Sequence, residues 1–189
     1  MSSPEPPAPP TAPSVVIGPP EILQRAGSEV ARLAMLPRWT PAFAESSPGT
    51  PLLVRRLDQK DRYYYIVSYH VGTRVTARLQ MNAHTGNYWE CIGIGTSGDA
   101  LDPYHTPVET HQRIATVLKA EAEKKTRTKK AKRKQPLPVM TTEPFLVWKP
   151  CAQSLSAFLP FYLIKVPTSE RYVRVDGKVY DALTFGAGL

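Results

Sequence analysis

The sequence predicts an α+β protein built from two tandem units, each a helix followed by about four antiparallel strands (α-β-β-β-β). Two observations support this fold class. The apolar residues of the 189-residue chain switch from helical spacing to the period of two that half-buried strands show, and the same order of elements then occurs again. We place the units at residues 19–100 and 101–189. Because each unit is small for a stable core, we expect their sheets to join, edge to edge or face to face.

A leader precedes the first unit at residues 1–18. It consists mainly of Pro, Ala and Ser, a composition that buries little apolar surface and samples extended, polyproline-like conformations. We therefore predict that the leader is disordered.

The first unit begins with a helix between Pro20 and Pro37, because proline suits the first turn of a helix and stops its continuation. Residues 38–51 are punctuated by Pro and Gly and predict a loop. Alternating apolar residues then predict four strands, at 52–57, 63–71, 75–82 and 88–94. In the third of these, Thr76, Arg78, Gln80 and Asn82 point away from the apolar face, which favours a sheet with one buried face.

The second unit follows a loop at residues 95–106. Thr106, Pro107 and Glu109 have the spacing of a capping box with proline in the first helical position, which predicts a helix start. Strands are predicted at 145–148, 161–166, 171–175 and 179–183, and Asp176-Gly177 is a hairpin signal between the last two. Similar segments recur in the two halves: 51–56 matches 144–149, 64–67 matches 161–164, and 77–90 matches 172–181.

The run Asn82-Ala83-His84-Thr85-Gly86 ends a strand within Tyr63–Cys91 and resembles the Asp-Ala-x-Thr-Gly turn of PepSY-type domains, with Asn82 in place of the acid. The resemblance covers roughly residues 20–94 and, without the full turn motif, 107–183. It implies a PepSY/cystatin-like helix on an antiparallel sheet, often in tandem copies. It also implies a non-enzymatic role in binding or restraining proteins, often peptidases. The family is usually secreted or membrane-attached.

Aromatic residues supply the candidate partner-binding set. Tyr63, Tyr64 and Tyr65 place rings on both faces of one strand. Core packing is the preferred interpretation of one face, and the other is either covered by a helix or free for a partner. The residues proposed to bind a protein or peptide are Tyr64, Ile66, His70 and Trp148.

The net charge of +8 comes from one basic segment, residues 124–134. The other 178 residues carry 16 basic and 16 acidic side chains, so the body is neutral. Such a segment favours a solvated helix end or a contact with a polyanion, and nucleic-acid binding is the alternative function. Its cations are Lys124, Lys125, Arg127, Lys129, Lys130, Lys132, Arg133 and Lys134.

Catalytic and metal-binding patterns are absent from the sequence. A nucleophilic Cys91 or Cys151 would need a nearby base, and the spacing places no histidine beside either. His105 and His111 are six residues apart, which does not suit metal binding by one helix face. We expect no catalytic residue, no metal and no cofactor. Two cysteines, no secretory signal and no apolar stretch of about 20 residues favour a cytoplasmic protein without a membrane span.

Overall fold

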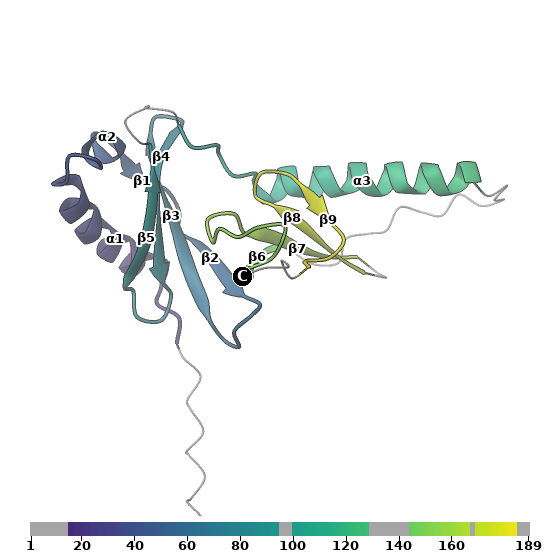
Figure 1. The fold of residues 1–189 in the computed structure, drawn as a ribbon, viewed down its shortest axis with the longest axis horizontal. Helices are drawn as coiled ribbons and strands as arrows, with labels where there is room; N and C mark the ends of the chain where they lie inside the picture. The colour runs from purple at the N-terminus through teal and green to yellow at the C-terminus, as the bar shows by residue number, and fades with distance from the viewer. Residues whose placement is uncertain (1–14, 95–99, 129–143, 167–168, 185–189) are drawn as a thin grey trace, which may run out of the picture.

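Three helices and nine strands form the computed structural model, which describes residues 15–94, 100–128, 144–166 and 169–184 (Figure 1). The helices are α1 (Pro19–Ala34), α2 (Thr40–Phe43) and α3 (Pro107–Thr128). The strands are β1 (Ser47–Pro48), β2 (Leu52–Arg56), β3 (Tyr63–Val71), β4 (Arg74–Asn82), β5 (Tyr88–Gly93), β6 (Phe145–Trp148), β7 (Phe161–Val166), β8 (Ser169–Arg174) and β9 (Val179–Tyr180). The α+β class predicted from the sequence is confirmed.

The two halves of the chain meet edge to edge in one sheet. Its strand order is β5-β4-β3-β2-β6-β7-β8-β9, with β1 paired to β3. Every described pairing is antiparallel except the one between β2 and β6, where Val54 lies opposite Leu146. The first-half strands β3, β4 and β5 follow on one side of this parallel pair, and the second-half strands β7, β8 and β9 follow on the other. The β2–β6 pair therefore joins the two halves, and we call it the seam.

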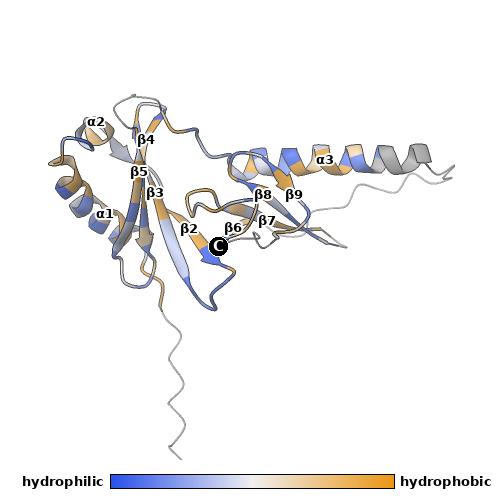
Figure 2. Ribbon diagram, viewed as in Figure 1, coloured by the Kyte–Doolittle hydropathy of each residue, from blue (hydrophilic) through white to orange (hydrophobic). Residues whose placement is uncertain are grey.

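The α1 cluster is the core of the first half. Ile22 and Ala26 of the amphipathic α1 are fully buried and pack with Tyr65 and Val67 of β3 and Leu79 of β4. Figure 2 shows both hydrophobic and hydrophilic residues along α1. This helix therefore covers one face of the first-half sheet, as its apolar spacing predicts.

The junction cluster is the second core and spans the seam. Tyr64 and Ile66 of β3 pack there with Ile114 of α3 and with Phe158 and Phe161. Because successive strand residues point to opposite faces, the α1 cluster and the junction cluster lie on opposite faces of β3. The buried residues thus form two clusters, with α1 and α3 on different sides of the sheet (Figure 1).

The segment predicted as a loop at residues 38–51 contains two short elements. The α2 helix is held by Phe43, whose ring lies edge-on to Tyr69 with centroids 5.5 Å apart. Strand β1 pairs Ser47 with His70. Both elements are too short to show the periodic spacing of apolar residues from which helices and strands are predicted. They depend instead on contacts with β3, which is distant in the sequence.

The polar residues of β4 correct the expectation of one buried face. Thr76, Arg78, Gln80 and Asn82 are all buried, although their side chains lie on the face opposite the α1 cluster. A polar alternation predicts which face a side chain is on, but not whether a distant part of the chain covers that face.

The predicted leader is also corrected, because it contacts the body before residue 18. The Ile17 backbone N–H donates to the Ala83 carbonyl at 2.8 Å, and the Tyr65 hydroxyl donates to the Ile17 carbonyl at 2.9 Å. Val16 and Ile17 pack against the α1 cluster. The remaining residues of the leader, 1–14, lie outside the described residues.

Deleting residues 1–18 is therefore expected to destabilise the protein, by about 1–3 kcal/mol, because two hydrogen bonds and the packing of Ile17 are lost. Deleting only residues 1–14 is the matched control and should leave the unfolding midpoint in denaturant unchanged. Equal midpoints for both deletions would show that residues 15–18 contribute nothing to stability.

The turn after β4 is organised by Asn82. Its side-chain Oδ1 accepts hydrogen bonds from the backbone N–H groups of His84 and Thr85, at 2.8 and 2.9 Å. Gly86 has a φ of 68°, and a Cβ at this position would collide with the Arg25 side chain. The Asn82 side chain thus supplies the acceptor that organises this turn.

Replacing Asn82 by Ala is expected to cost about 1–3 kcal/mol of stability, since the backbone N–H groups of His84 and Thr85 lose their acceptor. Asn82→Asp keeps an oxygen in the same place and is the control that should retain most of the stability. Chemical unfolding of the three proteins measures the difference, and an Ala variant as stable as the Asp variant contradicts this role.

Candidate functional site

The predicted partner surface at Tyr64, Ile66 and Trp148 is wrong, because the junction cluster buries all three. Tyr64 and Ile66 have no exposed area, and Trp148 is 6% exposed. The Tyr64 hydroxyl donates to the Ala157 carbonyl at 2.8 Å, and its ring lies edge-on to Trp148. These residues hold the two halves together and are not available to a partner.

His70, the fourth predicted partner residue, is half-buried near the end of β3. It lies opposite Ser47 of β1, and Gly49 passes close to its ring. The structure therefore separates His70 from the other three predicted residues and places it beside the β1 segment.

The basic segment is described only in part. Lys124, Lys125 and Arg127 belong to α3, which continues to Thr128 and extends well past the strands (Figure 1). The other five cations, Lys129, Lys130, Lys132, Arg133 and Lys134, lie outside the described residues.

The predicted start of α3 is confirmed. The Thr106 backbone N–H donates to the Glu109 carboxylate at 2.7 Å, and the Glu109 N–H donates to the Thr106 hydroxyl at 3.2 Å.

The outer edge of β5 is the first candidate site. Among the described residues, β5 pairs only with β4, so one side of its backbone has no strand partner. The register of this pair shifts between Gln80 and Met81, which leaves Trp89 as an extra residue. A bulge of this kind re-aims a side chain, and the Trp89 side chain is 44% exposed. We call the residues Tyr88–Gly93 the β5 edge.

A pocket of about 320 Å³ between the two halves is the second candidate site. Arg78 of β4 and Ile92 of β5 form one wall, and residues 101–104 form the second. Residues of the second half complete it, among them Phe158, Leu159 and Val175. We call this cavity the junction pocket. Its size is at the lower end of the range for ligand sites, which suits a small molecule or a single side chain.

Arg78 gives the junction pocket its positive charge. The residue is 4% exposed, and its guanidinium lies 3.7 Å from the centre of the Tyr104 ring. One of its terminal nitrogens donates to the Asp102 carbonyl, whereas its Nε has no hydrogen-bond partner among the residues that the structure describes. Burial lowers the pKa of Arg78, and the charges of Tyr104 and Asp102 oppose this effect. The Arg78 guanidinium is thus removed from water, and its contacts with Tyr104 and Asp102 offset only part of the cost of burying its charge.

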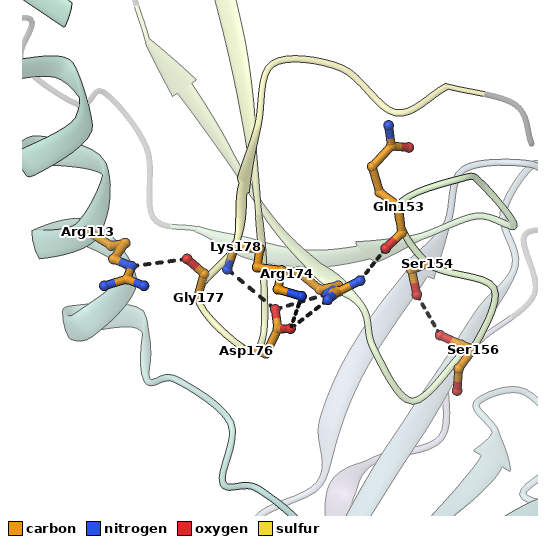
Figure 3. Close-up of polar contacts among 8 residues, drawn as sticks. All are labelled: Arg113, Gln153, Ser154, Ser156, Arg174, Asp176, Gly177 and Lys178. Atoms are coloured by element: carbon orange, nitrogen blue, oxygen red, sulfur yellow. Dashed lines mark hydrogen bonds and ion pairs between the residues drawn. The ribbon is translucent and has the colours of Figure 1, made fainter. Parts of the chain in front are cut away.

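An ion pair fixes the second-half wall of the pocket (Figure 3). Arg174 donates to both carboxylate oxygens of Asp176, at 2.9 and 2.6 Å, and also to the Gln153 carbonyl. These bonds lower the pKa of Asp176 and keep it ionised. Arg113 of α3 donates to the Gly177 carbonyl at 3.1 Å, which ties the same turn to the helix. The negative charge of Asp176 is therefore already paired.

Neither cysteine has the properties of a nucleophile. Burial, with a smaller contribution from Glu90, raises the pKa of the Cys91 thiol to about 12, and Cys151 is buried in the junction cluster. Among the described residues, no group of three or more His, Cys, Asp and Glu side chains is arranged to hold a metal ion.

Both thiols are expected to react slowly with iodoacetamide at pH 8 in the folded protein, because a thiol with a raised pKa is protonated there and a buried thiol is inaccessible. The unfolded protein in denaturant is the control and should be alkylated at both positions. Rapid alkylation of the folded protein, followed by mass spectrometry, would contradict the inert character of these thiols.

Comparisons with known proteins give no assignment: no protein-family model, no curated protein and no solved structure matches this chain. In the part of the chain that the structure describes, no helix is both long and apolar enough to cross a membrane.

Sequence reasoning did not single out Arg78, Trp89 or Tyr104 as site residues. Arg78 was expected on a polar sheet face, and Trp89 lies in an ordinary strand pattern. Both become notable only because of a bulge and a segment more than 20 residues away. A buried arginine in an alternating strand has no local signal that distinguishes it from an exposed one.

Proposed function

We propose that this chain is a non-catalytic module that binds an extended segment of another protein or a peptide along the β5 edge. The observation that carries the proposal is the β5 backbone, which has no strand partner on its outer side among the described residues. An unpaired edge offers a row of N–H and C=O groups to an added strand, and this is a common mode of peptide recognition.

The side chains around the β5 edge suit such a partner. The partly exposed indole of Trp89 offers a large apolar surface with a polar N–H, the combination favoured at binding hot spots. Arg32 of α1 lies over the Tyr88 ring, 5.9 Å from its centre, and Glu90 of the same strand is exposed. Backbone hydrogen bonds would supply the affinity, and Trp89 would supply the selection among side chains.

The test is selection of binders from a displayed library of unstructured peptides, followed by hydrogen exchange of the complex. We expect bound peptides to slow exchange of the β5 amides and to lose affinity at least about tenfold with Trp89→Ala. Val108→Ala, which removes a comparably exposed apolar side chain from α3, is the control and should bind normally. Peptides that protect other segments, or that bind Trp89→Ala equally well, would overturn the proposal.

The resemblance to PepSY-type domains makes a peptidase the first partner class to test, with restraint or assistance of that peptidase as the expected effect. We take a cytoplasmic setting, in which both thiols stay unpaired, as part of this proposal.

Non-specific nucleic-acid binding through residues 124–134 is the second candidate. The observation that favours it is the continuation of α3 past the sheet, which carries the start of the basic segment away from a neutral body (Figure 1). Fluorescence anisotropy with labelled single-stranded DNA should show binding that weakens steeply with salt. Replacing the eight Lys and Arg residues by Gln should abolish it. Binding that survives this replacement would contradict the assignment.

A further inference from the structure

We infer that the junction pocket binds a carboxylate carried on a small apolar body, with Arg78 as the residue that holds the carboxylate. This site is separate from the β5 edge, and the inference does not depend on the proposed function. The same chemistry is presented by a free small acid and by the C-terminal residue of a peptide chain.

The charge in the pocket calls for an anion. Arg78 is only 4% exposed, and no described residue accepts a hydrogen bond from its buried Nε. The residue that acts as its counter-charge, Asp102, is exposed to solvent, which screens that charge. A guanidinium pairs with a carboxylate in a bidentate fork that matches its geometry. Because Arg78 lines the pocket, a ligand carboxylate there would neutralise a charge that the described residues compensate only in part.

The acids near the pocket do not compete with such a ligand. Asp176 is held by two hydrogen bonds from Arg174, and Asp102 meets the guanidinium through its backbone carbonyl (Figure 3 shows the Arg174–Asp176 pair). Arg78 is the one cation that the described residues contribute to the lining, so it can neutralise a single negative charge. The second charge of a phosphate would be left unpaired beside apolar walls, which favours a singly charged ligand.

The remaining walls determine the rest of the ligand. Ile92, Leu101, Phe158, Leu159 and Val175 are apolar, and apolar surface makes up the larger part of the lining. A cavity of about 320 Å³ admits an aliphatic or small aromatic group but not a nucleotide-sized cofactor. The ligand class is therefore an apolar acid of the size of one acylated amino acid.

The experiment titrates the full chain with N-acetyl-L-leucine and, as the matched neutral probe, with N-acetyl-L-leucine N-methylamide. Calorimetry measures the affinity, and ¹H–¹⁵N spectra of arginine side chains follow the Nε–H of Arg78. We expect the acid to bind and to shift the Arg78 signal, and the amide to bind at least about tenfold more weakly. Equal binding of the two probes, or no binding of the acid, would overturn the inference.

Variants test the residue assignment. Arg78→Met removes the charge and should lose the preference for the acid, whereas Arg78→Lys should keep part of it. Since Arg78 is buried and its replacement could unfold the protein, a second pair changes the half-buried Leu101 on the opposite wall. Leu101→Glu places a negative charge in the pocket and should abolish binding of the acid, and Leu101→Gln should retain it. Equal affinities for the Leu101 pair would also overturn the inference.

Two further probes distinguish the sources of the carboxylate. A pentapeptide Gly-Gly-Ser-Gly-Leu with a free C-terminus is compared with its C-terminal amide. If N-acetyl-L-leucine and the free peptide both bind and the peptide amide does not, a chain end is a ligand of the pocket. If N-acetyl-L-leucine binds and neither peptide does, the ligand is a free acid. Inorganic phosphate should not compete with either, and competition by phosphate would contradict the preference for a singly charged ligand.

Discussion

Residues 15–100 expressed without the second half are expected to aggregate, dimerise or unfold at much lower denaturant concentration than the full chain. Val54, Tyr64 and Ile66 are fully buried in the junction cluster and would become exposed. Each such side chain contributes roughly 1.5–3 kcal/mol on burial, which is a large part of the stability of a small domain. The β2 backbone would also lose its parallel partner β6 and become an open edge.

The measurement combines the solution mass of the fragment with its denaturant unfolding curve. The full chain is the control and should unfold in one transition, because the junction cluster belongs to both halves. A fragment that is monomeric and as stable as the full chain would show that the two halves are independent.

Phe158→Ala is expected to be the most destabilising single substitution that we propose, at about 3–5 kcal/mol. Phe158 lies in the segment between β6 and β7, is 2% exposed, and packs against the residues of both halves in the junction cluster. Its removal would leave a cavity beside Tyr64 and would also enlarge the junction pocket that it lines.

Leu155→Ala is the matched control, because Leu155 lies in the same segment but is 66% exposed. Its effect on the free energy of unfolding should be within about 0.5 kcal/mol. Similar losses for the two variants would show that the segment is stabilised by its backbone rather than by the insertion of Phe158 into the junction.

Several elements could be predicted from the sequence because their causes are local. The limits of β3 follow from the alternation of its apolar residues, and the start of α3 follows from the capping box of Thr106 and Glu109. Gly86 and Gly177 have a positive φ, and both lie in turns that the sequence marks, at Asn82–Gly86 and at Asp176-Gly177. In each case, residues within a few positions supply the stabilising contacts.

The candidate sites could not be predicted in the same way. The residue types of Tyr64 and Arg78 suggested a partner face and a solvent face, and the structure buries both. The segments that cover them, around Ala157 and Asp102, lie 93 and 24 residues away. Neither segment carries a pattern that indicates its destination.

The sequence by itself determined the α+β class, the order of most helices and strands, and which side chains share a strand face. Periodicity and turn chemistry act over short distances along the chain, so they can be recognised in the sequence alone. Only the tertiary structure decided that β2 pairs with β6 in parallel, that Tyr64 and Ile66 are core residues, and that a pocket with Arg78 lies between the halves. These features depend on contacts between distant segments, whose free energy comes from the apolar area that both segments bury together.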